Sequence, residues 1–292
     1  MYAQLGLPQP GDDDRLRSDD LEFLREFLVV FDAREVGLGD DFLLRAARLC
    51  GDSIRHLVES LNAMMREELV PAMARSSPEA PQMRGGGPFI ATSRLADWLL
   101  RRHLEAVIHG NIVENIERVM EETGIGRRRD PHPPAIGFID LSGFTRLTGT
   151  KGDEEAARLA VQLSDLVQAS TASRGGRAVK SLGDGVMLHF RDPDQAVAAA
   201  LDLVDVIPEG GLPPARVGIA SGPVVFRDGD YFGRAVNVAA RITDYARPSE
   251  VLVSETVAES AAAPGTTFED LGDVELKGIP EPVRLLRATR DL

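Results

Sequence analysis

Apolar residues recur at spacings of three and four through the first part of the chain, which is the period of an amphipathic helix. The pattern predicts helices near residues 21–31, 42–49 and 54–64, and aspartates precede the first two, as helix starts prefer. A longer helix is predicted from residue 93 to about residue 122. Strand-like alternation is lacking here. We therefore predict an all-α regulatory or dimerisation domain at residues 18–123, after a flexible N-terminus at residues 1–17.

The pattern changes after a basic, proline-rich segment, GIGRRRDPHPP at residues 124–134, which is typical of a linker. Strand patterns then alternate with helical ones, and two pairs of strands are joined by short turns. This alternation predicts an α+β domain at residues 135–292, built as an α/β sandwich around a mixed sheet. The expected strands are at 135–141, 177–190 with a turn at 183–185, 215–226 with a turn at 221–223, 251–254 and 268–289; the expected helices are at 153–173, 194–206 and 235–245.

Composition narrows the classes of function. The 292 residues are 43% apolar, so the chain is globular, and they carry a net charge of −13. Such an acidic chain disfavours nucleic acid and anionic membrane surfaces as partners. The single cysteine, Cys50, excludes an intrachain disulfide and a cysteine-based zinc site. Without a signal-peptide pattern or a long apolar stretch, we expect a cytoplasmic protein with no membrane span.

Two aspartates follow strand patterns in the second domain. Asp140 ends the first strand, and Asp184 lies in the turn of KSLGDGVM between Gly183 and Gly185. Glycines allow a backbone to approach a ligand closely, and Mg²⁺ takes one or two carboxylates while keeping positions for phosphate and water. Aspartates in such turns are also common without any function. The pair is therefore a candidate metal site that needs support from its neighbours.

Further polar residues lie near these turns. The loop LSGFTR after Asp140 can direct backbone N–H groups at an anion, and it contains Phe144 and Thr145. Asn237 and Arg241 are four residues apart and so share one face of a predicted helix. A guanidinium suits phosphate. Each feature alone is also typical of a solvated surface.

The segments FIDLSGFT, KSLGDGVM, GDYFGRAVNVAAR and LGDVELKGIPEPVRLL occur in this order. Together they resemble the catalytic domain of class III adenylate/guanylate cyclases, over residues 135 to about 290. The resemblance implies a ferredoxin-like type of α/β sandwich. It also implies two Mg²⁺ or Mn²⁺ ions per active site, held by Asp140, Asp184 and the backbone carbonyl of Leu141.

The resemblance also assigns roles to the remaining polar residues. Lys180 and Asp230 match the pair that recognises adenine, and Asn237 and Arg241 match the pair that stabilises the transition state. Lys277 matches a lysine near the terminal phosphates, and Phe144 and Thr145 complete the expected substrate-binding set. Lysine only donates hydrogen bonds and aspartate only accepts them, which suits N1 and the amino group of adenine and not guanine.

These roles imply an adenylate cyclase that converts ATP to 3′,5′-cyclic AMP and pyrophosphate. In the family the metal ligands and the other catalytic residues come from different subunits, so the resemblance implies a homodimer with two composite sites. Three alternatives remain: a guanylate cyclase, a catalytically inactive nucleotide-binding regulator, and a structural partner for another cyclase chain.

Residues 18–75 are similar to the regulatory domain of mycobacterial pH-responsive cyclases. Histidine titrates between about pH 5 and 8, which makes His56, His103 and His109 candidate proton sensors. A histidine on an amphipathic helix is more commonly a packing residue. A dimerisation scaffold and a site for a lipid-like effector are the other interpretations of this domain.

Overall fold

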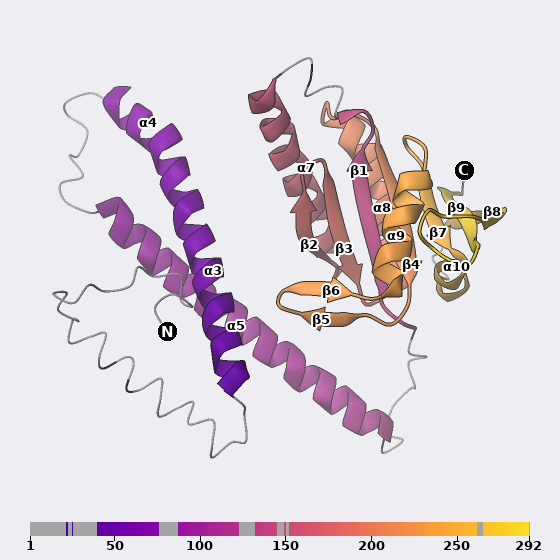
Figure 1. Ribbon diagram of the computed structural model, residues 1–292, viewed down its shortest axis with the longest axis horizontal. Helices are drawn as coiled ribbons and strands as arrows, with labels where there is room; N and C mark the ends of the chain where they lie inside the picture. The colour runs from indigo at the N-terminus through magenta and orange to yellow at the C-terminus, as the bar shows by residue number, and fades with distance from the viewer. Residues whose placement is uncertain are drawn as a thin grey trace. The chain divides into compact units, whose positions relative to one another are not determined.

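The computed structural model describes residues 22, 25, 40–75, 87–122, 132–144, 149, 152–261 and 265–291. The chain divides into two compact units, Met1–Thr123 and Gly124–Leu292 (Figure 1). No helix among the described residues is both long and apolar enough to cross a membrane.

The first unit is helical throughout residues 40–75 and 87–122, as predicted. Helix α3 runs from Asp40 to Met64 without a break, so the helical patterns at residues 42–49 and 54–64 belong to one continuous helix; a single glycine, Gly51, costs only about 1 kcal/mol inside a helix. The predicted helix at residues 21–31 falls outside the described residues except for Glu22 and Arg25, which are helical. After α3 come a π-helical turn, Met65–Leu69, then α4, Val70–Arg75, and α5, Gly87–Glu122.

The second unit is built on a mixed seven-stranded sheet, which confirms the predicted class. Neighbouring strands are antiparallel except β4 and β7, which are parallel. In spatial order the strands are β2 (Arg177–Leu182), β3 (Gly185–Phe190), β1 (Ala135–Leu141), β4 (Ala215–Ser221), β7 (Val251–Ser254), β9 (Val283–Arg290) and β8 (Thr266–Val274).

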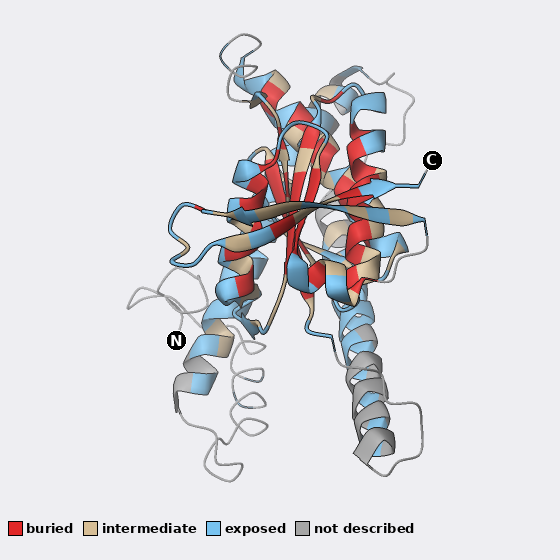
Figure 2. Ribbon diagram, turned by 90° about the vertical axis from the view of Figure 1, so that its right-hand side faces the viewer, coloured by how far each residue is buried: buried red, intermediate tan, exposed pale blue. Residues whose placement is uncertain are grey.

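Helices cover both faces of this sheet and create two separate apolar cores (Figure 2). One core joins the sheet to α7 (Asp153–Ser173), α8 (Pro193–Glu209) and α10 (Glu255–Ser260). The other joins the opposite face to α9 (Arg234–Tyr245). Successive residues of a strand face opposite ways, so β3 sends Leu188 into the first core and Met187 into the second.

A short hairpin, β5 (Val225–Arg227) and β6 (Asp230–Phe232), forms its own two-stranded sheet. The sequence pattern indicated a second strand after the turn at residues 221–223 but gave no sign of β6. Strand β5 pairs with β6 and not with β4, with Val225 opposite Phe232. Three-residue strands are too short for alternation to reveal.

Helix α9 lies very close to β4 because Gly218 has no side chain. A Cβ on Gly218 would lie 2.3 Å from the backbone nitrogen of Thr243 and 2.7 Å from the carbonyl oxygen of Ala239. Any larger residue would push the helix outward. Gly218 therefore sets how α9 presents Asn237 and Arg241.

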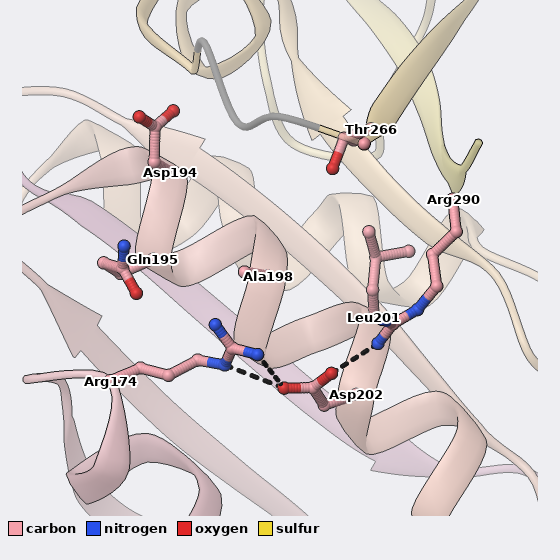
Figure 3. Close-up of a pocket in the computed structure, with 9 residues that line it drawn as sticks. Arg174, Asp194, Gln195, Ala198, Leu201, Asp202, Thr266 and Arg290 are labelled. Atoms are coloured by element: carbon pink, nitrogen blue, oxygen red, sulfur yellow. Dashed lines mark hydrogen bonds and ion pairs between the residues drawn. The ribbon is translucent and has the colours of Figure 1, made fainter.

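Asp202 of α8 links three parts of the second unit (Figure 3). Arg174, after α7, donates two hydrogen bonds to one carboxylate oxygen of Asp202, and Arg290 of β9 donates to the other. Burial alone would raise the pKa of Asp202. The hydrogen bonds from Arg290 and Arg174 and their positive charges outweigh burial, so the pKa lies below its ordinary value.

We expect Asp202→Asn to lower the free energy of unfolding at pH 7 by about 1–2 kcal/mol, because two guanidinium groups lose a charged acceptor. A depressed carboxylate pKa stabilises the fold above the unfolded-state value of about 3.9, and that stability is lost as the pH falls through the folded-state value. The gap between wild type and variant should therefore narrow below about pH 4. Urea unfolding at pH 7 and at a pH below about 4 measures this difference in the free energy of unfolding. Asp165→Asn, at an exposed position of α7, is the control; equal stability of the two variants at pH 7 would contradict the linking role.

Candidate active site

Asp140 lies near the end of β1, where the sheet register places it between Gly185 of β3 and Arg216 of β4. Arg216 donates two hydrogen bonds to the Oδ2 atom of Asp140, at 2.9 Å from Nε and 2.6 Å from Nη2. Burial raises the pKa of Asp140, Arg216 opposes this shift, and the negative charge of Asp184 adds to it. The site thus brings a half-buried carboxylate, a second carboxylate and one guanidinium together.

Asp184 occupies the turn between β2 and β3. Its carbonyl oxygen accepts a hydrogen bond from the backbone N–H of Leu141 at 3.1 Å. A Cβ on Gly185 would come within 3.1 Å of the carbonyl oxygen of Ile139 and 3.6 Å of the Asp140 carboxylate. Glycine therefore allows the turn to approach Asp140. The side chain of Leu141 is buried, so only its backbone is available to a ligand.

These residues fit a magnesium-type site better than a closed protein cage. Within the described residues there is no cluster of three or more His, Cys, Asp and Glu side chains that could hold a metal. Two carboxylates and a backbone carbonyl leave coordination positions for water and phosphate, which Mg²⁺ prefers. The donor set therefore suits Mg²⁺ or Mn²⁺ bound together with a triphosphate.

Lys180 of β2 and Asp230 of β6 form an ion pair. The hydrogen bond from Lys180 lowers the pKa of Asp230, although burial opposes it, and the backbone N–H of Tyr231 also donates to Asp230 at 2.8 Å. The Lys180 side chain is 39% exposed. The two residues expected to recognise the base are therefore in contact and open to solvent.

Asn237 and Arg241 lie on the exposed face of α9, whose other face packs on the sheet. Arg241 donates to the carboxylate of Asp244 at 2.7 Å, and Arg216 donates to the carbonyl oxygen of Asp244 at 3.1 Å. In the described part of the chain, no hydrogen bond or ion pair joins Asn237 or Arg241 to the two aspartates at the end of β1 and β2.

The remaining expected site residues are Lys277, Phe144 and Thr145. Lys277 is exposed in the turn between β8 and β9, and Phe144 is partly buried against the core under α7 and α8. Thr145 falls outside the described residues. Cavities of about 260 and 340 Å³ on this unit are lined by other residues. Of the expected site residues, Asn237, Arg241 and Lys277 are exposed, whereas Phe144 is partly buried and Leu141 is buried.

Arg216 was not among the residues that the sequence motifs indicated. A signal was available, because Arg216 is the only charged residue of ARVGIAS, a strand whose other residues are largely buried. A charge in such a strand usually has a partner. The identity of that partner follows only from the register between β1 and β4, which are 76 residues apart at this contact.

Residues 132–286 match the family described as adenylate and guanylate cyclase catalytic domain. The chain is 31% identical over 265 residues to a pH-sensitive adenylate cyclase of Mycobacterium tuberculosis, covering 88% of this chain and 65% of that protein. It is 32% identical over 263 residues to an adenylate cyclase of Streptomyces coelicolor, covering 88% and 66%. The chain spans about two thirds of the length of these relatives.

The fold is also similar to that of a solved cyclase. The crystal structure of the adenylyl cyclase CyaB from P. aeruginosa matches with a TM-score of 0.50 and 22% identity, over 55% of this chain and 95% of that one. At this identity the likeness concerns the fold alone. Since the family model covers more than half of the chain, the chain belongs to the class III adenylate and guanylate cyclases, with its catalytic domain at residues 132–286.

Proposed function

We propose that this chain is an adenylate cyclase that converts ATP to 3′,5′-cyclic AMP and pyrophosphate. The observation that carries the choice of ATP is the exposed ion pair between Lys180 and Asp230. The lysine donates to the N1 acceptor of adenine and the aspartate accepts from its amino group, whereas guanine presents the opposite polarity at both positions. The relatives named above as adenylate cyclases support the same choice.

Asp140 and Asp184 would hold two Mg²⁺ or Mn²⁺ ions, with the backbone carbonyl of Leu141 as a further ligand. When bound, these ions neutralise charge on the triphosphate and lower the pKa of the ribose 3′-hydroxyl. Arg216 orients the Asp140 carboxylate through its two hydrogen bonds. The cyclic phosphate forms when the 3′-oxygen attacks the α-phosphorus and pyrophosphate leaves.

Arg241 stabilises the charge that develops on the α-phosphate, and Asn237 orients the ribose. Removal of one such donor typically lowers kcat by about 10²–10³-fold. Lys277 binds the terminal phosphates, while Phe144 and Thr145 belong to the loop beside them. Asn237, Arg241 and Lys277 are exposed and so are available to a nucleotide that is shared with a second copy of the chain, which would complete the site. The functional unit is then a symmetric homodimer with two composite sites.

The helical unit is proposed to support this dimer and to regulate it. Large apolar side chains of α5 are more than half exposed in one chain: Trp98 by 54%, Leu100 by 59% and Ile108 by 55%. Such exposed apolar side chains are available to a partner chain. His56 and His103 are exposed on α3 and α5, and the side chain of His109 falls outside the described residues.

One assay tests the function. Purified full-length protein is incubated with Mn²⁺ or Mg²⁺ and either ATP or GTP, and cyclic product is measured. Cyclic AMP from ATP, with little cyclic GMP from GTP, is expected; preferential use of GTP, or no cyclic product, would contradict the proposal. The same assay on residues 130–292 between about pH 5.5 and 8 tests regulation. A constant activity ratio between fragment and full-length protein would exclude a proton sensor in the helical unit.

A further inference from the structure

The side chain of Tyr231 lies within a stack of rings beside the base-recognition pair. Its ring is parallel to that of His189 on β3, with centroids 4.3 Å apart and an interplanar angle of 8°. Phe226 of β5 packs on it at 4.9 Å. Arg177 of β2 lies over both rings, 5.6 Å from that of Tyr231, and donates to its hydroxyl at 3.2 Å.

This stack helps to attach the β5–β6 hairpin to the main sheet, together with the ion pair between Lys180 and Asp230. Strands β5 and β6 pair with each other and form no ladder with the seven-stranded sheet among the described residues. A two-stranded hairpin by itself is only marginally stable in water. Side-chain contacts must therefore fix its position, and Tyr231 makes contacts with both β2 and β3.

An irregularity in β2 allows two side chains of this strand to contact the hairpin, one at Tyr231 and one at Asp230. Arg177 and Lys180 are three residues apart, so in a regular strand their side chains would point to opposite faces. The register between β2 and β3 shifts between Ala178 and Lys180. A bulge of this kind redirects a side chain. Arg177 consequently reaches Tyr231 while Lys180 reaches Asp230.

The link between the stack and Asp230 is short. Tyr231 follows Asp230 directly, and its backbone N–H donates to Asp230 Oδ1 at 2.8 Å. Oδ2 accepts from Lys180. Fixing the ring of Tyr231 on His189 therefore also fixes the backbone that carries and orients the Asp230 carboxylate.

We propose that Tyr231, stacked on His189 and bonded to Arg177, is a positioning residue for base selection that holds Asp230 beside Lys180 in the geometry that distinguishes adenine from guanine. The inference rests on the proposed adenylate cyclase function and deepens it. Tyr231 acts through Asp230 and makes no contact with the phosphates in this scheme. Its loss should therefore affect recognition of the base more than the chemical step.

The test compares Tyr231→Ala with Tyr231→Phe in the full-length protein. Tyr231→Ala should raise KM for ATP about tenfold and lower the ratio of kcat/KM for ATP over GTP about tenfold, the value of one well-placed hydrogen bond, while kcat changes by less than about threefold. Tyr231→Phe keeps the ring and should stay within about threefold of wild type in both quantities. The control is Phe232→Ala, which removes the neighbouring, exposed ring of the same strand and should leave the ATP/GTP ratio unchanged.

A second variant separates positioning from general stability. His189→Ala removes the other ring of the stack, the one on β3. Its effect on the ATP/GTP ratio should not add to that of Tyr231→Ala, because both variants remove the same ring contact. If thermal melting shows that Tyr231→Ala is unfolded, His189→Ala takes its place in the same kinetic comparison. An unchanged ratio in folded Tyr231→Ala or His189→Ala, or a loss of kcat with KM unchanged, would overturn the positioning role. A wild-type protein that forms no cyclic AMP would instead overturn the proposed function.

Discussion

Replacement of Asp140 by asparagine should lower cyclic AMP formation about 10³-fold or more. The carboxylate is the half-buried member of the acidic pair at the end of β1, and the neutral amide would bind a divalent cation weakly. The amide oxygen can still accept from Arg216, so the fold should persist. Burial already disfavours the charge of Asp140, which also limits the loss of stability when that charge is removed.

Initial rates with Mn²⁺ and ATP measure this effect, and thermal melting checks that the variant is folded. Asp165→Asn makes the same chemical change at an exposed position of α7 and should keep wild-type activity. Activity of a folded Asp140→Asn protein above about a tenth of wild type would contradict the role of Asp140, because the loss of a metal-binding carboxylate is expected to cost about 10³-fold.

Much of the fold could be predicted because its elements are long and bury one face. AIGFIDL forms β1, and the alanine-rich segments form α7, α8 and α9 close to the expected positions. The failures concern short or weakly marked elements. Strand β6 has three residues, which is too short for a periodic pattern to reveal.

The sequence motifs indicated individual residues of the candidate site but not which residues they contact. The order of the motifs indicated Asp140, Asp184, Lys180 and Asp230, but their partners depend on pairing between distant strands. Arg216 meets Asp140 through the β1–β4 register, and the bulge in β2 has no signature in RAVKSL. Contacts of this kind arise from tertiary packing and not from local pattern.

The proposed homodimer predicts that two inactive variants restore activity when they pair with each other. Asp140→Ala and Arg241→Ala should each be inactive as homodimers, because every site lacks either the metal ligand or the guanidinium. In a heterodimer, the site that takes Asp140 from one chain and Arg241 from the other is intact, while the second site lacks both. With random pairing of equal amounts, half of the dimers are mixed, and each has one working site of two. We therefore expect about a quarter of wild-type specific activity.

The heterodimer is obtained directly when the two variants carry different tags. They are mixed or co-expressed, and the product is purified through both tags in turn. That sample should reach about half of wild-type activity, since one of its two sites works. Asp140→Ala paired with the double variant Asp140→Ala/Arg241→Ala is the matched control, because neither site then contains Asp140. An inactive, folded heterodimer would show that Asp140 and Arg241 act from the same chain. Asn237, Arg241 and Lys277 are exposed. In the proposed arrangement, the facing subunit would enclose the nucleotide against these side chains.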